Sequence, residues 1–504
     1  MSRFGIILTT ILVSSVGVVL WFLSGSPTTS PSDQNPEELV FRLDSFAINL
    51  YPPALAEVNS RRIGTLLHEP LIRMAPDGSP EPAIASAWTR TGNTWRFEIA
   101  KNARFSDGGL VTPADVESSI CRSMQPSSSW GWSLTSILST KVGDRLLCDG
   151  IVSDGDFVEI RQSYDAPWLI EVLSGPAGWI IPKDASEPGA YGQVLGAGRY
   201  RIHSIAADSY VQLEPVDKTE GLAPVRFIYV PDDVRASSLF KSGKLATLHL
   251  QSPMLNKLVA EQAQSSKSKL RYRVVTHSFD RVRILIINEV RLTKMGLSPD
   301  AIGSFRDALD TSIDREKLEN LSSGLATAAA TPLPVFGSLR RQPPSERDLE
   351  KLPPLQLTVI TEPDAFSDQI AASLPGRIGN IRLDYRTVEK GLLIDSLVKK
   401  DFDIAAIVIE ATMHSPKFWS AFFDPSGAFV AFGKPIASIA DIDLSSEGAV
   451  GMLQDVLTKD SNWILLTQER RIDAVQPWVQ GMRYNRAGQD DLSGVILGTA
   501  PVAQ

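Results

Sequence analysis

Cysteine is scarce in this chain of 504 residues, where only Cys121 and Cys148 are present. Two cysteines cannot form a multi-disulfide scaffold or a four-cysteine metal site. They could form one disulfide in an oxidising compartment, or they could remain as two buried thiols. Spacing along the chain does not fix the separation of their Cα atoms, so the sequence leaves both states open.

An excess of basic residues is also missing. The chain has 50 Lys and Arg residues against 58 Asp and Glu residues, and its formal net charge is −8. Proteins that bind a nucleic-acid backbone need a positively charged surface, so no nucleic-acid partner is expected. The hydrophobic fraction of 43% and the charged fraction of 21% are typical of a folded protein. A chain of this length is expected to form two or more lobes.

Signatures of catalysis are absent as well. The sequence has no G-x-S-x-G elbow, no Walker A loop and no G-x-G-x-x-G fingerprint. None of the histidines forms a pair at a spacing that suits a metal ion. We therefore predict neither an enzyme nor a bound cofactor or metal. The five histidines are His68, His203, His249, His277 and His414.

One long uncharged stretch is present, from Phe4 to Leu23, and it is long enough to cross a bilayer. Arg3 precedes it, and the next basic residue is Arg42. This asymmetry places the N-terminus in the cytoplasm and the body of the protein outside the membrane. Small residues follow the stretch, but Pro27 disfavours a cut there. We expect an uncleaved anchor over residues 1–23, with a cleaved signal peptide as the alternative, and a periplasmic body.

The polar, Ser/Pro-rich stretch Ser24–Glu38 predicts a linker, and the first strand is expected at Leu39–Leu43. Thr112 suits a helix cap, Pro113 suits the first helical position, and Asp115 completes a capping box. Further strands of the first half are expected at Trp95–Ile99, Val158–Gln162, Arg199–Ile205, Val211–Leu213 and Val225–Val230.

The second half alternates between strands and helices. Phe305–Leu321 is predicted as one helix because Phe305, Leu309 and Ile313 share a face. A β-α-β-α-β order follows, which indicates a parallel sheet covered by helices. Ligands bind at the carboxyl ends of such strands, so the segment after Ile409 is a candidate site. The segments of this pattern are Leu357–Ile360, Asp364–Leu374, Ile381–Tyr385, Lys390–Lys399 and Ile404–Ile409.

Five segments together resemble one family, the extracytoplasmic solute-binding proteins of bacterial ABC importers, in the oligopeptide, dipeptide and nickel class known as family 5. Two of them, Trp95–Val116 and Phe305–Glu316, are specific signatures. The order is that of the family and covers nearly the whole chain after residue 38. The other segments are Gly64–Gly78 with Pro82–Trp88, Gly198–Pro215 and Gly391–Pro416.

The resemblance implies an α/β, two-lobe periplasmic-binding-protein-like fold of type II, with an extra subdomain inserted in the first lobe. It also implies a monomer that captures a peptide-like or small polar solute by hinge closure and delivers it to ABC permease subunits. The expected division is 1–23 anchor or signal, 24–38 linker, 39–74 first lobe, 75–190 insert, 191–270 first lobe, 271–440 second lobe and 441–504 return to the first lobe.

The resemblance also points to ligand-binding residues. Relatives that bind free peptides hold the α-amine with an aspartate, and that position falls on Thr412, which cannot form an ion pair. Glu410 could substitute as a carboxylate, and His414 as a donor. This departure puts dipeptide-type recognition in doubt, and Glu410 could instead cap a loop.

Aromatic residues provide further candidates. Trp130 and Trp132 could stack on a ligand or pack on the insert. Of Phe418 and Trp419, we expect one to face the core and Trp419 to line the cleft. Tyr51 could enter the pocket or form a plain turn before two prolines.

Two signature segments of the family are expected to be structural. Asp107 suits a turn, and Asp314–Arg315 suits a helix surface and pairing between the lobes.

A different class of function is also consistent with the sequence: a degenerate binding-protein fold that acts as a membrane-anchored sensor or envelope scaffold. The amine-binding aspartate is missing, and the anchor is expected to be uncleaved. The charged, Pro-rich connector Arg340–Pro354 lacks the helix that the family usually carries there.

Overall fold

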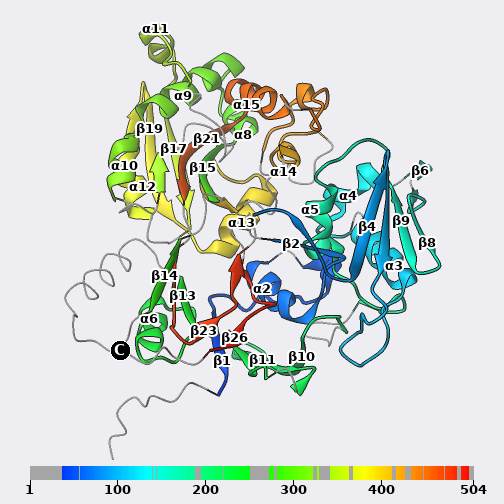
Figure 1. The fold of residues 1–504 in the computed structure, drawn as a ribbon. Helices are drawn as coiled ribbons and strands as arrows, with labels where there is room; N and C mark the ends of the chain where they lie inside the picture. Colours follow the sequence, from blue (N-terminus) through cyan, green and yellow to red (C-terminus); the bar gives the residue numbers. More distant parts are fainter. Residues whose placement is uncertain are drawn as a thin grey trace, which may run out of the picture. The chain divides into compact units, whose positions relative to one another are not determined.

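The structure is a computed structural model of the chain (Figure 1). It describes residues 37–504 except 56, 76, 126, 139, 143–144, 188–194, 219–220, 250–271, 277–280, 322–325, 329–340, 363–366, 411–415, 426–432, 447, 470–471, 485–489 and 499–504. The predicted anchor and most of the predicted linker lie outside the described residues. Within the described residues, the structure contains no helix that is long and apolar enough to cross a membrane.

A four-stranded sheet forms the first lobe. Its order is β1 (Leu39–Leu43), β12 (Val225–Tyr229), β11 (Tyr210–Pro215) and β10 (Tyr200–Ala206). Alternate residues of β1 are fully buried, as a half-buried strand requires. β1 runs parallel to β12, whereas β10 and β11 form the predicted antiparallel hairpin. Helix α2 (Val58–Leu67) packs its apolar face on the same core.

The insert has a second four-stranded sheet, with the order β4 (Ala85–Thr91), β5 (Thr94–Ile99), β9 (Phe157–Arg161) and β8 (Ile151–Asp154). Helices α3 (Pro113–Ser123), α4 (Gly131–Leu138) and α5 (Leu169–Leu173) accompany it (Figure 1). The smaller elements are β2 (Ile72–Met74), β3 (Pro80–Pro82), β6 (Thr140–Val142), β7 (Arg145–Leu147) and the 3-10 helices η1 (Pro52–Ala54) and η2 (Pro176–Gly178).

Of the two states that the sequence leaves open for the cysteines, the structure has the disulfide. Cys121 on α3 is bonded to Cys148, and their Cα atoms are 5.7 Å apart. The bridge ties helix α3 to the segment that follows β7.

A seven-stranded sheet forms the second lobe. Strands β17, β19 and β20 are parallel neighbours and are joined by α12 (Ser367–Ser373) and α13 (Lys390–Lys399), as the β-α-β-α-β pattern predicts. The remaining pairs are antiparallel, so the sheet is mixed. Its order is β16 (Ala326–Ala328), β21 (Trp463–Glu469), β15 (Arg281–Ile287), β20 (Ile404–Glu410), β17 (Leu355–Thr361), β19 (Ile381–Thr387) and β18 (Arg377–Ile378).

Strand β15 supplies residues to both faces of this sheet. Ile284 and Ile286 belong to one buried cluster with residues of α13 and α15 (Ala449–Asp460). Leu285 and Ile287 belong to another with residues of α9 (Pro299–Ser312) and α12. The continuous apolar run of this strand follows from its burial on both sides.

Two expectations for the second lobe are wrong in detail. The predicted single helix is divided into α9 (Pro299–Ser312) and α10 (Arg315–Leu321) because Ile313 is extended and the Asp314 carboxylate accepts the Lys317 amide at 2.9 Å. The connector predicted to lack a helix contains the short helix α11 (Glu346–Glu350).

The chain passes between the lobes through a three-stranded sheet of β13 (Thr247–His249), β22 (Ile472–Val475) and β14 (Arg273–Thr276). Because β21 is hydrogen bonded to β15, the second lobe continues to Glu469, and the return to the first lobe begins at β22 rather than at residue 441. The remaining elements are α6 (Asp233–Lys241), α8 (Glu289–Lys294), α14 (Pro416–Ser420), η4 (Ala437–Ile439), β23 (Val479–Gln480), β24 (Arg483–Tyr484), β25 (Asp490–Asp491) and β26 (Ile496–Leu497).

Candidate functional site

A pocket of about 350 Å³ lies where the first lobe meets the insert. Its walls come from α2 and β2 on one side, from α5 and η2 of the insert, and from β25 near the C-terminus. Among the described residues, Trp130 is the only one predicted to bind ligand that lines this pocket. The pocket is therefore not the cleft between the two lobes that the sequence led us to expect.

Helix α2 presents one face to this pocket and the opposite face to the core. The Glu57 carboxylate caps the helix by accepting the Ser60 amide at 2.8 Å. Ile63, Leu66 and Leu67 are buried, whereas residues at the complementary helical spacing line the pocket. The pocket residues of α2 are Val58, Arg61, Arg62 and Thr65.

The pocket wall contains ion pairs between different segments. Arg62 Nε lies 2.7 Å from Asp490 Oδ2, so helix α2 is joined to β25. Arg73 on β2 donates to the Glu69 carboxylate, which directly follows α2. The pKa of Glu69 is raised to about 7, chiefly by burial and also by Asp491, whereas Arg73 and Arg199 act to lower it. This carboxyl group therefore titrates near neutral pH.

His68 is fully buried beside this pair. Its ring stacks on Trp179, with ring centroids 5.3 Å apart, and its Nε2 lies 3.2 Å from the Leu50 carbonyl oxygen. Burial lowers the pKa of His68 to about 4, so the ring is neutral. The stack requires Gly64, because a Cβ there would lie 2.2 Å from Trp179 Cζ3.

Trp130 contacts the 3-10 helix η1, which directly follows Tyr51. Trp130 is 7% exposed, and its Nε1 donates to the Pro52 carbonyl oxygen at 3.1 Å. Tyr51 precedes η1 and is half-buried. Trp132 lies in α4, but its side chain is outside the described part of the structure. Trp130 therefore packs on the insert and also contributes an edge to the pocket.

The predicted ligand loop of the second lobe is described only at its ends. Glu410 is the last residue of β20, opposite Arg281 of β15. Thr412 and His414 lie outside the described residues. Trp419 on α14 is 2% exposed and contacts Phe418 and Phe422 edge-on or at a tilt. Both Phe418 and Trp419 are buried, so the expectation that only one faces the core is wrong.

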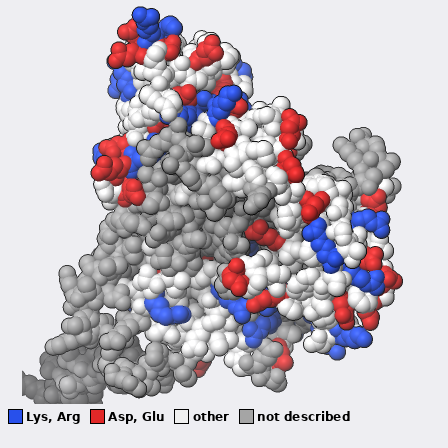
Figure 2. Space-filling model, turned by 45° about the horizontal axis from the view of Figure 1, so that its top comes forward, with Lys and Arg blue, Asp and Glu red and all other residues white. Residues whose placement is uncertain are grey.

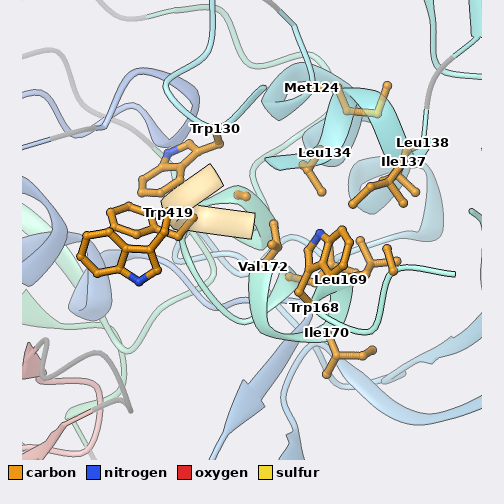
Figure 3. Close-up of a cluster of buried hydrophobic side chains, with 14 of the residues drawn as sticks. Met124, Trp130, Leu134, Ile137, Leu138, Trp168, Leu169, Ile170, Val172 and Trp419 are labelled. Carbon is orange, nitrogen blue, oxygen red and sulfur yellow. The ribbon is translucent and has the colours of Figure 1, made fainter. Parts of the chain in front are cut away.

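Trp130 and Trp419 come from different lobes but belong to the same cluster of buried hydrophobic side chains. Figure 3 draws the two indoles on the same side of this cluster. The predicted aromatic residues are thus brought together, although their sequence positions are far apart. Their burial leaves them in contact with protein side chains.

Charges of both signs are distributed over the described surface. Figure 2 shows Lys, Arg, Asp and Glu side chains interspersed on the face in view. Within the described residues, no group of three or more His, Cys, Asp or Glu side chains is placed to hold a metal ion.

Residues 79–352, more than half of the chain, match the model of the family described as bacterial extracellular solute-binding proteins, family 5 middle. The chain belongs to this family. The dipeptide-binding protein DppE of Bacillus subtilis is 25% identical over 210 residues, which are 38% of this chain and 39% of that protein. The periplasmic oligopeptide-binding protein OppA of Escherichia coli is 25% identical over 181 residues, 33% of each chain. These matches span less than half of the curated relatives.

Solved structures of other solute-binding proteins share the fold of this family 5 protein. The murein tripeptide binding protein MppA of Escherichia coli has a TM-score of 0.74 at 18% identity, covering 91% of this chain and 98% of its own. OppA of Burkholderia pseudomallei has a TM-score of 0.75 at 17% identity, covering 92% and 99%. These likenesses show the two-lobe α/β fold.

Sequence reasoning missed most of the pocket. His68, Glu69 and Arg73 lie within the segment Gly64–Gly78, which carries part of the family resemblance, but no motif marks them as a site. An acid and a base four positions apart, Glu69 and Arg73, are a detectable signal. The ion pair between Arg62 and Asp490 of β25 is not, because it depends on the fold.

Proposed function

We propose that this family 5 protein captures a peptide-like or other small polar solute outside the cytoplasm and passes it to the permease of an ABC importer. The observation that carries the proposal is the family match across the middle of the chain, together with the two-lobe fold. Trp130 of the insert and Trp419 of the second lobe support it, because they belong to one buried cluster and so join parts of the chain that a bound ligand would hold together.

The substrate class rests on Glu410, the last residue of β20. It provides a carboxyl group at the carboxyl end of a parallel strand, where ligands of α/β sheets bind. A carboxylate suits a ligand amine. The sensor or scaffold alternative is not favoured by the relatives, whose names describe dipeptide, oligopeptide and nickel binding.

Thermal unfolding in the presence of peptide, amino-acid, sugar and metal-chelate pools tests the proposal. A ligand at a hundredfold excess over its dissociation constant should stabilise the protein by about 2.7 kcal/mol. We expect one pool to raise the melting temperature and Glu410→Gln and Trp419→Phe to reduce the shift.

A matched control is Trp95→Phe. The Trp95 indole also packs against a phenylalanine ring, with the centroids of Trp95 and Phe97 6.1 Å apart, but it lies on β5 of the insert and not in the second lobe. This variant should keep the ligand-induced shift. Absence of any shift across all pools would refute the transport function.

We also propose that residues 1–23 anchor the protein to the inner membrane and leave the body in the periplasm, with the Ser/Pro-rich stretch as the tether. The uncharged run Phe4–Leu23 and the charge asymmetry around it support this. The intact mass of the protein purified from cells should include Met1. A mass that begins after Leu23 would show a cleaved signal peptide instead.

A further inference from the structure

The pocket between the first lobe and the insert contains more charged and aromatic side chains than packing alone requires. Its volume of about 350 Å³ falls within the range of small-ligand sites and far exceeds the share of one water molecule. We propose that it is a second ligand site, separate from the cleft between the lobes, and that it takes a small zwitterion such as a free amino acid. The pocket residues that carry this proposal are Glu69, Arg73, Glu171, Asp491, Trp168 and Trp179.

Charges of both signs face the pocket and are held in place. Arg73 is paired with Glu69, and Arg62 is paired with Asp490. A carboxylate offers about four lone-pair sites and a guanidinium five donors, so each paired group can still bind a ligand. An ammonium group can approach Glu69, and a carboxylate group can approach Arg73. A ligand with only one of these groups would form one charge-assisted contact with the pocket instead of two.

Apolar walls complete the site. Trp168 is 5% exposed and Trp179 is 4% exposed, and both line the pocket. Their rings limit the water around the ion pairs, which strengthens electrostatic interactions with a bound ligand. They also offer a surface for an apolar side chain. An amino acid with such a side chain, for example L-leucine, matches the combination of charges and rings.

The binding should depend on pH through Glu69. The charged groups that act on it are Arg73 of β2, Asp491 of β25 and Arg199 before β10, with neutral His68 next to it in the chain. The pKa of Glu69 is about 7, and a ligand ammonium favours its ionised form. Affinity for the zwitterion should therefore rise with pH through about 7 and level off above it.

Calorimetric titration of the full chain with L-leucine tests the proposal, with L-leucinamide and N-acetyl-L-leucine as probes that lack one charge each. We expect L-leucine to bind and each analogue to bind at least about tenfold more weakly, because each loses a charge-assisted hydrogen bond. Glu69→Gln should weaken binding of L-leucine and remove its pH dependence.

A second variant tests the pocket independently, in case Glu69→Gln does not fold. Val58 lines the pocket on α2 and is 37% exposed, so Val58→Trp should obstruct the pocket without removing a buried polar group. Val290→Trp, at an exposed helix start in the second lobe, is its matched control and should leave binding unchanged.

The outcomes separate this site from the one under the proposed function. Loss of L-leucine binding in Val58→Trp but not in Trp419→Phe supports the second site. Loss in Trp419→Phe alone would place the ligand between the lobes and would overturn this inference while supporting the proposed function. No binding of L-leucine by the unmodified chain, or unchanged binding in both pocket variants, would also overturn it.

Discussion

Gly64 is the residue on which the packing of α2 against the insert depends most directly. An alanine Cβ there would overlap the Trp179 ring, whereas a Cβ at Gly303, also within a helix, would meet nothing within 4 Å. We predict that Gly64→Ala lowers the free energy of unfolding by about 2 kcal/mol, as overpacking does. Gly303→Ala should raise it by up to about 1 kcal/mol. Urea denaturation of both variants checks this, and equal effects would contradict the packing.

The pH dependence of stability tests the burial of Glu69. Its folded pKa of about 7 exceeds its ordinary value of 4.5, so between these pH values the folded state holds a proton that the unfolded chain releases. Stability contributed by the protonated group is full below about 4.5 and is lost as the pH rises towards 7. Relative to Glu69→Gln, the unmodified protein should lose about 2–3 kcal/mol over this window.

His68 affects the pH dependence of stability in the opposite direction. Its pKa falls from 6.5 to about 4, so the folded state binds fewer protons in this window and stability rises with pH. In the Glu69→Gln variant, the free energy of unfolding should therefore rise between pH 4 and 6.5. In the unmodified protein, the titration of Glu69 partly offsets this rise. Chemical denaturation at a series of pH values measures both slopes, and parallel profiles would rule out the buried carboxyl group.

The role of a single residue was predictable where it depends on the local backbone geometry alone. The Asp107 carboxylate accepts the Gly109 amide at 2.8 Å, as a turn residue should. Arg315 was expected to pair between the lobes, but it binds Asp310 and the Leu465 carbonyl oxygen within the second lobe. The burial of Glu69 and His68 depends on segments far away in the chain, so no local pattern reveals it.

Among the elements, helix α3 begins with the capping box that the sequence predicts. Thr112 accepts the Asp115 amide, and the Asp115 carboxylate accepts the Thr112 amide at 2.8 Å. We predict that Thr112→Ala costs about 1 kcal/mol of stability, whereas Thr112→Ser costs little because it keeps the hydroxyl. Thermal unfolding of the two variants compares them, and equal losses would exclude the cap as the cause.

The disulfide stabilises the insert through the loop that it closes. Cys121 and Cys148 are separated by 27 positions, and the chain-entropy relation for such a loop gives about 3–4 kcal/mol. The double variant Cys121→Ser, Cys148→Ser should lose about this much and become insensitive to a reducing agent. Free thiols detected in the exported, unmodified protein would contradict the bridge.

Elements with a regular spacing of hydrophobic residues were predictable, whereas the residues at which they begin and end were less so. The β-α-β-α-β order of the second lobe was predicted as the structure has it, because the hydrophobic spacing of strands and that of helices alternate there. The break between α9 and α10 follows from Asp314 acting as a cap inside an otherwise helical pattern. The pairing of β21 with β15 is not visible locally, because the two strands are far apart in the sequence.

For the whole molecule, the two lobes and the insert were predictable through the family resemblance and the change of pattern between the halves. The position of the pocket was not, because residues of α2, α5, η2 and β25 meet only in the folded chain. The same holds for Trp130 and Trp419, which the fold places in one buried cluster.

The central claim is that this family 5 protein binds a solute, and native mass spectrometry of the exported protein tests it most directly. The account predicts a population with the mass of the chain plus one small ligand, which dissociates on collisional activation and decreases in Trp419→Phe but not in Trp95→Phe. A protein that carries no added mass, and gains none when incubated with peptide, amino-acid, sugar and metal-chelate pools, would contradict the account.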